Sequence, residues 1–97
     1  MSRRRYVVCY DIRDPYRLKD VGRGMKQFGY MFQYSVYICD LDAREKIALR
    51  LVIGDLIDQR VDTVALIDLG RVDADPSQRF EWIGAQTDLP GTGWTIW

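Results

Sequence analysis

The chain has 97 residues, which is enough for one small domain, and its composition excludes several kinds of chemistry. Lysine and arginine together number 14, aspartate and glutamate also number 14, and histidine is absent. The lack of histidine excludes the usual general base, the Ser-His and Cys-His nucleophile systems and most zinc sites. There is no Gly-rich phosphate-binding loop, so any catalysis would rest on carboxylates, a hard metal ion, or Lys, Tyr and Cys side chains.

Charge is distributed unevenly along the chain. Residues 1–30 hold eight basic and three acidic side chains, whereas residues 31–97 hold six basic and eleven acidic ones. Such asymmetry is compatible with a basic face that follows phosphates, and also with ordinary solvated charge. The basic N-terminus is followed by strand-like residues and not by the apolar core of a signal peptide, and no run is long enough to span a membrane, so we expect a cytoplasmic protein.

The first third of the chain predicts a strand followed by a helix. Residues 5–12 are rich in β-branched and aromatic side chains and contain no Gly or Pro, which is typical of a central strand. Asp14 and Pro15 then suit the N-cap and the first position of a helix. Gly29 is expected to stop that helix in the left-handed conformation. The apolar face of the helix is spaced by threes and fours: Leu18, Val21, Met25 and Phe28.

The middle of the chain predicts strand structure followed by a second helix. Residues 30–40 are β-rich and long enough for one bent strand or two short ones. Asp42 and Glu45 form an acidic variant of the capping box, and a helix is expected over residues 43–59. Cys9 and Cys39 each lie in a strand-like run without a CxxC pattern, so we expect buried thiols and not a disulfide or a metal pair.

The last third predicts a strand over residues 61–69, a turn-rich loop, and a short edge strand over residues 79–84. The order β-α-β(β)-α-β predicts an α+β, ferredoxin-like domain over residues 1–84, with an irregular tail over residues 85–97. Two helices cover only one face of such a sheet. The apolar residues on the strands exceed what two helices can cover, so we expect a homodimer through the sheet faces.

Three short motifs carry a resemblance to a known family. They are Tyr10-Asp11-Ile12 at the end of the first strand, Phe28-Gly29-Tyr30 after the first helix, and Gln33-Tyr34-Ser35-Val36-Tyr37. In this order and spacing they resemble the second of the two near-universal CRISPR-associated proteins, the Cas-two family. The resemblance covers residues 5–84. This chain departs from many members by having Met31-Phe32 in place of a basic residue before the third motif, and by having Asp20 within the basic cluster of its first helix.

The resemblance implies a homodimer whose sheets face each other, with the short strand over residues 79–84 joining the partner's sheet. It implies a role in spacer acquisition, the adaptation step of CRISPR immunity, in which the dimer bridges two dimers of the integrase partner and holds the DNA to be inserted. It also implies a metal-dependent endonuclease acting on RNA or double-stranded DNA, in which Asp11 and its symmetry mate bind Mg²⁺. The open alternatives are a non-catalytic ferredoxin-like regulatory or interaction module, and a toxin-type RNase that shares the fold.

Asp11 is the candidate catalytic and metal-binding residue. Magnesium is anchored by one or two carboxylates and keeps its other positions for water and substrate, so a two-fold axis would supply what a single Asp lacks. A turn-capping role is the alternative for Asp11. Tyr10 and Ser35 are candidate supporting residues, with core packing as their alternative. Nucleic-acid phosphates are expected at a set of arginines that could equally be solvated surface: Arg3, Arg4, Arg5, Arg13 and Arg17.

Overall fold

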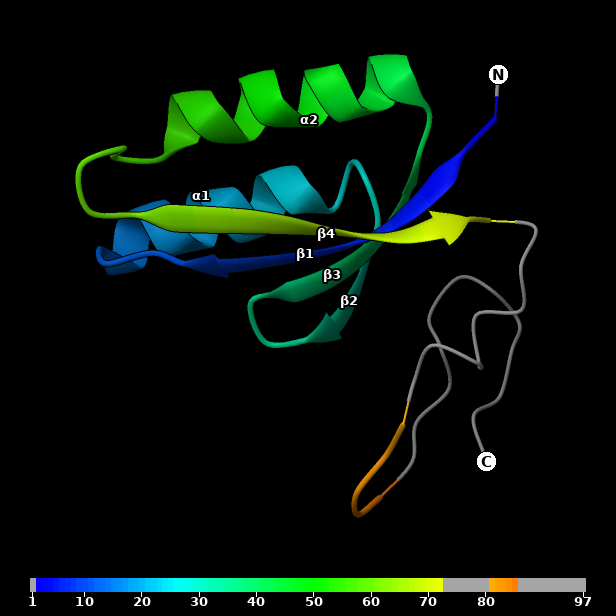
Figure 1. Ribbon diagram of the computed structural model, residues 1–97. Helices are drawn as coiled ribbons and strands as arrows, with labels where there is room; N and C mark the ends of the chain where they lie inside the picture. The colour runs from blue at the N-terminus through cyan, green and yellow to red at the C-terminus, as the bar shows by residue number, and fades with distance from the viewer. Residues whose placement is uncertain (1, 73–80, 86–97) are drawn as a thin grey trace.

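The computed structural model describes residues 2–72 and 81–85 of the chain. Its six elements are β1 (Arg4–Asp11), α1 (Pro15–Met25), β2 (Tyr30–Gln33), β3 (Val36–Leu41), α2 (Ala43–Leu56) and β4 (Thr63–Arg71) (Figure 1). The strands form one antiparallel sheet in the order β2-β3-β1-β4. The predicted α+β, ferredoxin-like order is therefore confirmed.

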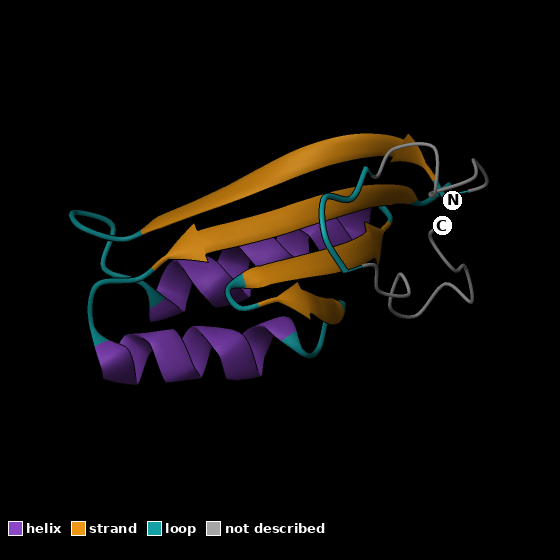
Figure 2. Ribbon diagram, turned by 90° about the horizontal axis from the view of Figure 1, so that it is seen from below, coloured by secondary structure: helices purple, strands orange, loops and turns teal. Residues whose placement is uncertain are grey.

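Both helices lie on the same side of the sheet, which gives the molecule two layers (Figures 1 and 2). Alternate residues of β1, Tyr6 and Val8, point into the space between the layers and are buried. The helices contribute apolar side chains spaced by four residues to the same core: Val21 and Met25 from α1, Leu49 and Ile53 from α2. No helix within the described part of the chain is both long and apolar enough to cross a membrane.

Local hydrogen bonds fix the start of each helix. Asp14 is the N-cap of α1 and accepts a hydrogen bond from the backbone N–H of Arg17 at 2.9 Å, with Pro15 in the first turn. The predicted capping box at the start of α2 is confirmed. Asp42 Oδ1 accepts from the Glu45 N–H at 2.8 Å, and Glu45 Oε1 accepts from the Asp42 N–H at 3.0 Å.

The prediction that Gly29 stops the first helix in the left-handed conformation is wrong. α1 ends at Met25, and the described glycines with positive φ are Gly70 and Gly84. A glycine is required at position 29 for a different reason. A Cβ atom there would collide with the backbone carbonyl oxygen of Ile38 and would lie 2.6 Å from Cys39 Sγ. Glycine thus allows the chain to pass close to β3.

The β-rich run over residues 30–40 forms two strands joined by a two-residue turn. Ser35, the second residue of that turn, has φ 61°, in the left-handed region that tight hairpin turns use. β4 runs past its predicted end to Arg71, because Arg71 pairs with Arg4 beyond an irregularity in the β1–β4 register. Gly70, expected in a loop, lies within this strand with φ 96°.

The sheet face away from the helices carries rows of paired residues. Val7 of β1 lies opposite Ile38 of β3 and Ile67 of β4, while Asp11 lies opposite Thr63. Because side chains alternate along a strand, Asp11, four positions after Val7 in β1, is on the same open face.

Trp82 returns across this open face. It packs against Ile38, as Val7 and Phe32 do, and its ring centroid lies 5.3 Å from that of Phe32. Of the predicted strand over residues 79–84, the described residues form a bend and no strand within the single chain, which corrects that prediction. Residues 79 and 80 lie outside the described part, as does the expected tail from residue 86 onward.

Candidate functional site

Asp11, the leading candidate from the sequence, is the last residue of β1. Its side chain is 70 % exposed on the open face, and Arg13 Nη2 lies 3.7 Å from its Oδ2. At that distance the two side chains form a loose, solvent-screened ion pair, which contributes little to the stability of the fold. The carboxylate is therefore available to a ligand. A carboxylate that only caps a turn would not need to be so exposed.

Asp62 holds the loop that follows Asp11. Its side chain is fully buried and accepts hydrogen bonds from the backbone N–H groups of Arg13 at 2.9 Å and Asp58 at 2.8 Å. Arg17 Nε donates to the same carboxylate at 2.8 Å. The Arg17 hydrogen bond is the main cause that lowers the pKa of Asp62 well below its usual range, so the carboxylate stays charged.

Sequence reasoning placed Asp62 only near the start of a strand and gave it no role. The available signal was an aspartate directly before a β-rich run, four residues after another aspartate. That pattern identifies a turn, but it does not show that the side chain reaches back to residues 13 and 17.

Tyr10 and Ser35 adjoin Asp11 without sharing its surroundings. Tyr10 points to the helix side, where its ring stacks with that of Tyr37 at 6.3 Å between centroids. Burial is the main cause that raises the pKa of Tyr10 to about 12, so the hydroxyl remains protonated. Ser35 is linked to β1 through its backbone carbonyl, which accepts from the Tyr10 N–H at 3.1 Å. Both residues thus position the end of β1, and Tyr10 lies on the face opposite Asp11.

Arg5 is built into the fold, contrary to its prediction as a phosphate contact. Its side chain is 6 % exposed, and Nε and Nη2 donate to the two carboxylate oxygens of Asp40 at 2.7 and 2.8 Å. A guanidinium held by a bidentate, largely desolvated pair is not available to nucleic acid. The cause is its place in the strand: Arg5 and Asp40 are directly opposed in the β1–β3 register.

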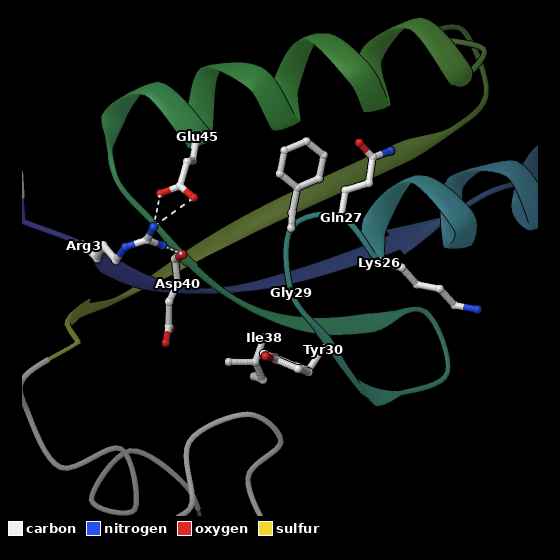
Figure 3. A pocket seen from close by; sticks show the side chains of 9 residues that line it. Arg3, Lys26, Gln27, Gly29, Tyr30, Ile38, Asp40 and Glu45 are labelled. Atoms are coloured by element: carbon white, nitrogen blue, oxygen red, sulfur yellow. Dashed lines mark hydrogen bonds and ion pairs between the residues drawn. The ribbon is translucent and has the colours of Figure 1, made fainter.

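The other four predicted arginines are more accessible. Arg3 donates to the Asp40 carbonyl at 2.7 Å and lies 3.0 Å from Glu45 in a cavity of about 410 Å³, where it points toward both residues (Figure 3). Arg4 pairs with Asp68 at 2.8 Å, and Arg17 is committed to Asp62. Arg13 is the most exposed of the five at 67 % of its side chain. It is also the one beside Asp11.

At the end of β1, on the open face, each chain presents the exposed carboxylate of Asp11 to a divalent cation. Within residues 2–72 and 81–85, no group of three or more acidic or cysteine side chains could hold a metal ion. Asp62 is saturated by its hydrogen bonds, and Asp14 caps α1. Asp11 has the hard oxygen donors that Mg²⁺ prefers, so the residues fit this ion if a second copy supplies a second Asp11.

The two cysteines are free thiols. Cys39 is buried in the helix-side core, and burial is the main cause that raises its pKa to about 12, which keeps the thiol protonated and unreactive. Cys9 is only partly buried, because it lies on the open face opposite Ala65. The expectation of a buried thiol therefore holds for Cys39 and not fully for Cys9.

Comparison with known families gives one consistent result. The family model described as CRISPR associated protein Cas2 matches residues 4–75. The CRISPR-associated endoribonuclease Cas2 1 of Rhodospirillum rubrum is 45% identical over 65 residues, which cover 67% of this chain and 64% of that protein. The CRISPR-associated endoribonuclease Cas2 2 of Thermodesulfovibrio yellowstonii is 44% identical over 64 residues, 66% of this chain and 70% of that one. The match thus spans less than two thirds of the length of the Rhodospirillum rubrum relative.

Solved structures show the same likeness in three dimensions. The crystal structure of Streptococcus pyogenes Cas2 at pH 6.5 superposes with a TM-score of 0.72 at 25% identity, covering 82% of this chain and 99% of that one. A hypothetical protein of Thermus thermophilus, TT1823, superposes with a TM-score of 0.67 at 27% identity over 92% of both chains.

Proposed function

Because the chain belongs to the CRISPR-associated Cas2 family, we propose that it acts in CRISPR immunity as a homodimer that binds nucleic acid and cleaves it at the Asp11 carboxylates. The observation that carries this proposal is the position of Asp11. It is an exposed carboxylate at the end of the central strand, on the face of the sheet that the helices leave open. The endoribonuclease names of the relatives agree with a hydrolytic role.

The proposed dimer uses the open face. Ile67 is 50% exposed there, in the same row as Val7 and Ile38, and exposed apolar side chains of this kind are buried when two sheets pack together. A two-fold axis through this face that passes near the end of β1 would bring two copies of Asp11 to one site.

Four residues at and around the end of β1 have a part in the proposed reaction: Asp11, Arg13, Arg17 and Asp62. The two Asp11 carboxylates would hold Mg²⁺, and the ion would supply charge neutralisation at the phosphoryl oxygens and a more acidic water as nucleophile. Arg13, 3.7 Å from Asp11, contacts the phosphate of the substrate and offsets its charge. Asp62 and Arg17 keep the loop between Asp11 and α1 in place, which orients Arg13 through its backbone N–H.

The test is nuclease activity on single-stranded RNA and on double-stranded DNA, with magnesium or with EDTA. Wild type is expected to cleave at least one of these substrates only with magnesium, and Asp11→Ala is expected to lose cleavage while remaining dimeric. Asp55→Ala is the matched control, because Asp55 is an exposed carboxylate on α2, away from the open face. Equal cleavage by wild type and Asp11→Ala would contradict the catalytic role.

The dimer has its own test. Ile67→Asp should give a monomer by light scattering at micromolar concentration, whereas Ile47→Asp should leave the dimer intact. Ile47 is 60% exposed and lies on α2, so it controls for adding a charge at an exposed apolar position. A monomeric wild type under the same conditions would contradict the proposed dimer.

A second candidate function is a scaffold in spacer acquisition, in which the dimer holds duplex DNA for the integrase partner. The observation that favours it is that the side chains of Arg3, Arg4 and Arg13 stay 49%, 47% and 67% exposed although each has a carboxylate partner. Phosphate contacts of this kind bind without reading sequence and weaken steeply with salt. Salt-sensitive duplex binding that survives Asp11→Ala, together with co-elution with the integrase, would support the scaffold even without cleavage.

A further inference from the structure

A groove of about 710 Å³ lies between α1 and the β2–β3 hairpin. Lys19 and Gly22 of α1 and Lys26, directly after it, form one wall, and the hairpin residues Met31 and Tyr34 form the other. The groove is on the helix side of the sheet, since Tyr10 contributes to it and points away from the open face. It is therefore distinct from the Asp11 face and stays accessible when that face is covered.

Tyrosine rings shape the groove. Tyr10 and Tyr37 stack at its floor with an interplanar angle of 25°, and Tyr37 Oη is fixed by donating to the Gly22 carbonyl at 3.2 Å. Tyr16 and Tyr34 at its edges are 80% and 77% exposed, respectively. The floor is thus rigid, while the two edge rings present aromatic surface to solvent that the fold itself does not use.

The charges around the groove have one sign. Lys19, Arg23 and Lys26 are exposed and line it, and no carboxylate among the described residues does so. Asp20 lies 3.8 Å from Arg23, a solvent-exposed pair too loose to cancel the charge of the groove. The surroundings therefore favour an anionic ligand that also carries a flat ring.

We propose that this groove binds an unpaired nucleotide of a nucleic-acid strand. Its base stacks on Tyr34 and Tyr16, and its flanking phosphates contact Lys19 and Lys26. Stacking tolerates any base, because every base has a π-face, while the cations follow the backbone. The inference rests on the proposed nucleic-acid-binding function but uses residues on the opposite side of the sheet. A dimer would carry two such grooves, each able to take an unpaired segment or end of the strand.

The test compares two fluorescent probes by anisotropy in EDTA, which prevents cleavage. One probe is a short oligothymidylate, and the other is an abasic strand of the same length with the same phosphates. Wild type is expected to bind the base-containing strand more tightly. Tyr34→Ala should lower that affinity by roughly fivefold to a hundredfold, the range measured for base–aromatic stacking, and leave the abasic strand unaffected. Tyr34→Phe keeps the ring and should retain wild-type affinity.

A second variant tests the contribution of the lysines that line the groove. Lys19→Gln with Lys26→Gln should weaken both probes equally and reduce the salt dependence of binding, because it removes phosphate contacts and not stacking. Photo-cross-linking with a 5-iodouracil strand should label the peptides that contain Tyr16 or Tyr34. Tyr34 is exposed, so these substitutions are not expected to disturb folding, and circular dichroism checks this.

The outcomes separate this inference from the proposed function. Equal wild-type affinity for the two probes, with duplex binding intact, would overturn the groove assignment and leave the Asp11 proposal standing. If wild type bound no duplex DNA, the proposed nucleic-acid-binding function itself would be contradicted. If Tyr34→Ala changed only the oligomeric state, the groove would be a protein contact and the inference would be wrong.

Discussion

Arg17 and Asp62 form a bidentate ion pair that connects the first turn of α1 to the residue before β4. Arg17 Nε lies 2.8 Å from Asp62 Oδ2, and Nη2 lies 3.3 Å from Oδ1. The next residue of the chain, Thr63, pairs with Asp11 across the β1–β4 ladder. The position of Asp11 thus depends on a contact between residues 45 apart in the sequence.

Asp62→Asn should lower stability at neutral pH and flatten its dependence on acid. The folded pKa of Asp62 is lowered from its ordinary value near 3.8, chiefly by the Arg17 hydrogen bond. Its stabilisation is therefore full above the unfolded pKa and is lost as the pH falls toward the folded pKa, between about pH 5 and pH 2. Urea midpoints across this range should fall more steeply for wild type than for Asp62→Asn.

Some acid dependence should persist in Asp62→Asn. The pKa values of Asp42, Asp58 and Asp68 are also lowered, mainly by hydrogen bonds that these carboxylates accept from the Glu45 N–H, from Arg60 and from Arg4, respectively. An unchanged acid profile in the variant would show that these three carboxyls, and not Asp62, dominate.

Arg5→Ala should destabilise the protein without a direct effect on phosphate binding. It leaves Asp40 without its bidentate partner and removes a buried side chain, which should cost about 2–3 kcal/mol, less than a fully buried pair because Asp40 is 30% exposed. Arg13→Ala is the matched comparison, since its side chain is 67% exposed. Arg13→Ala should keep wild-type stability in urea and weaken duplex binding. The reverse pattern would mean that the fold tolerates loss of the Arg5 pair.

Gly29→Ala and Gly22→Ala should change stability in opposite directions. A methyl group at position 29 meets the Ile38 carbonyl oxygen and Cys39 Sγ, so the backbone must shift at a cost of about 1–3 kcal/mol. At position 22 the nearest atom is Tyr10 Oη at 3.7 Å, an ordinary contact. Ala there should stabilise α1 by about 0.5–1 kcal/mol through its helix propensity. Urea unfolding of both variants at one protein concentration checks this, and a stabilised Gly29→Ala would refute the close approach.

Trp82→Ala should cost more stability than Trp82→Phe. Trp82 covers Ile38 on the open face, and removing it exposes that surface at a cost of about 2 kcal/mol. Its Nε1 is buried and finds no acceptor among the described residues. Phe retains much of the apolar contact and removes this unpaired donor, so its loss should stay below about 1 kcal/mol. Wild-type stability of Trp82→Ala would show that packing by Trp82 contributes little.

The sequence by itself determined the order of elements and the helix starts, because these depend on neighbours in the chain. The apolar spacing of Leu18, Val21 and Met25, the Asp14 cap and the Asp42–Glu45 box are local and lie where they are predicted, whereas Phe28 falls beyond the end of α1. The resemblance of the three motifs to the Cas2 family could also be recognised from the sequence, because each motif is a short continuous run of residues. Asp11 could be singled out for the same reason.

Only the tertiary structure decided which of the candidate residues are available. Arg5 and Arg13 look alike in sequence, yet the β1–β3 register places Arg5 against Asp40 and leaves Arg13 in solvent. Gly29 was assigned to a helix stop because its partner, the β3 backbone, is distant in sequence. Contacts of this kind depend on strand register and on the closure of long loops, and a single sequence read along its length does not specify them.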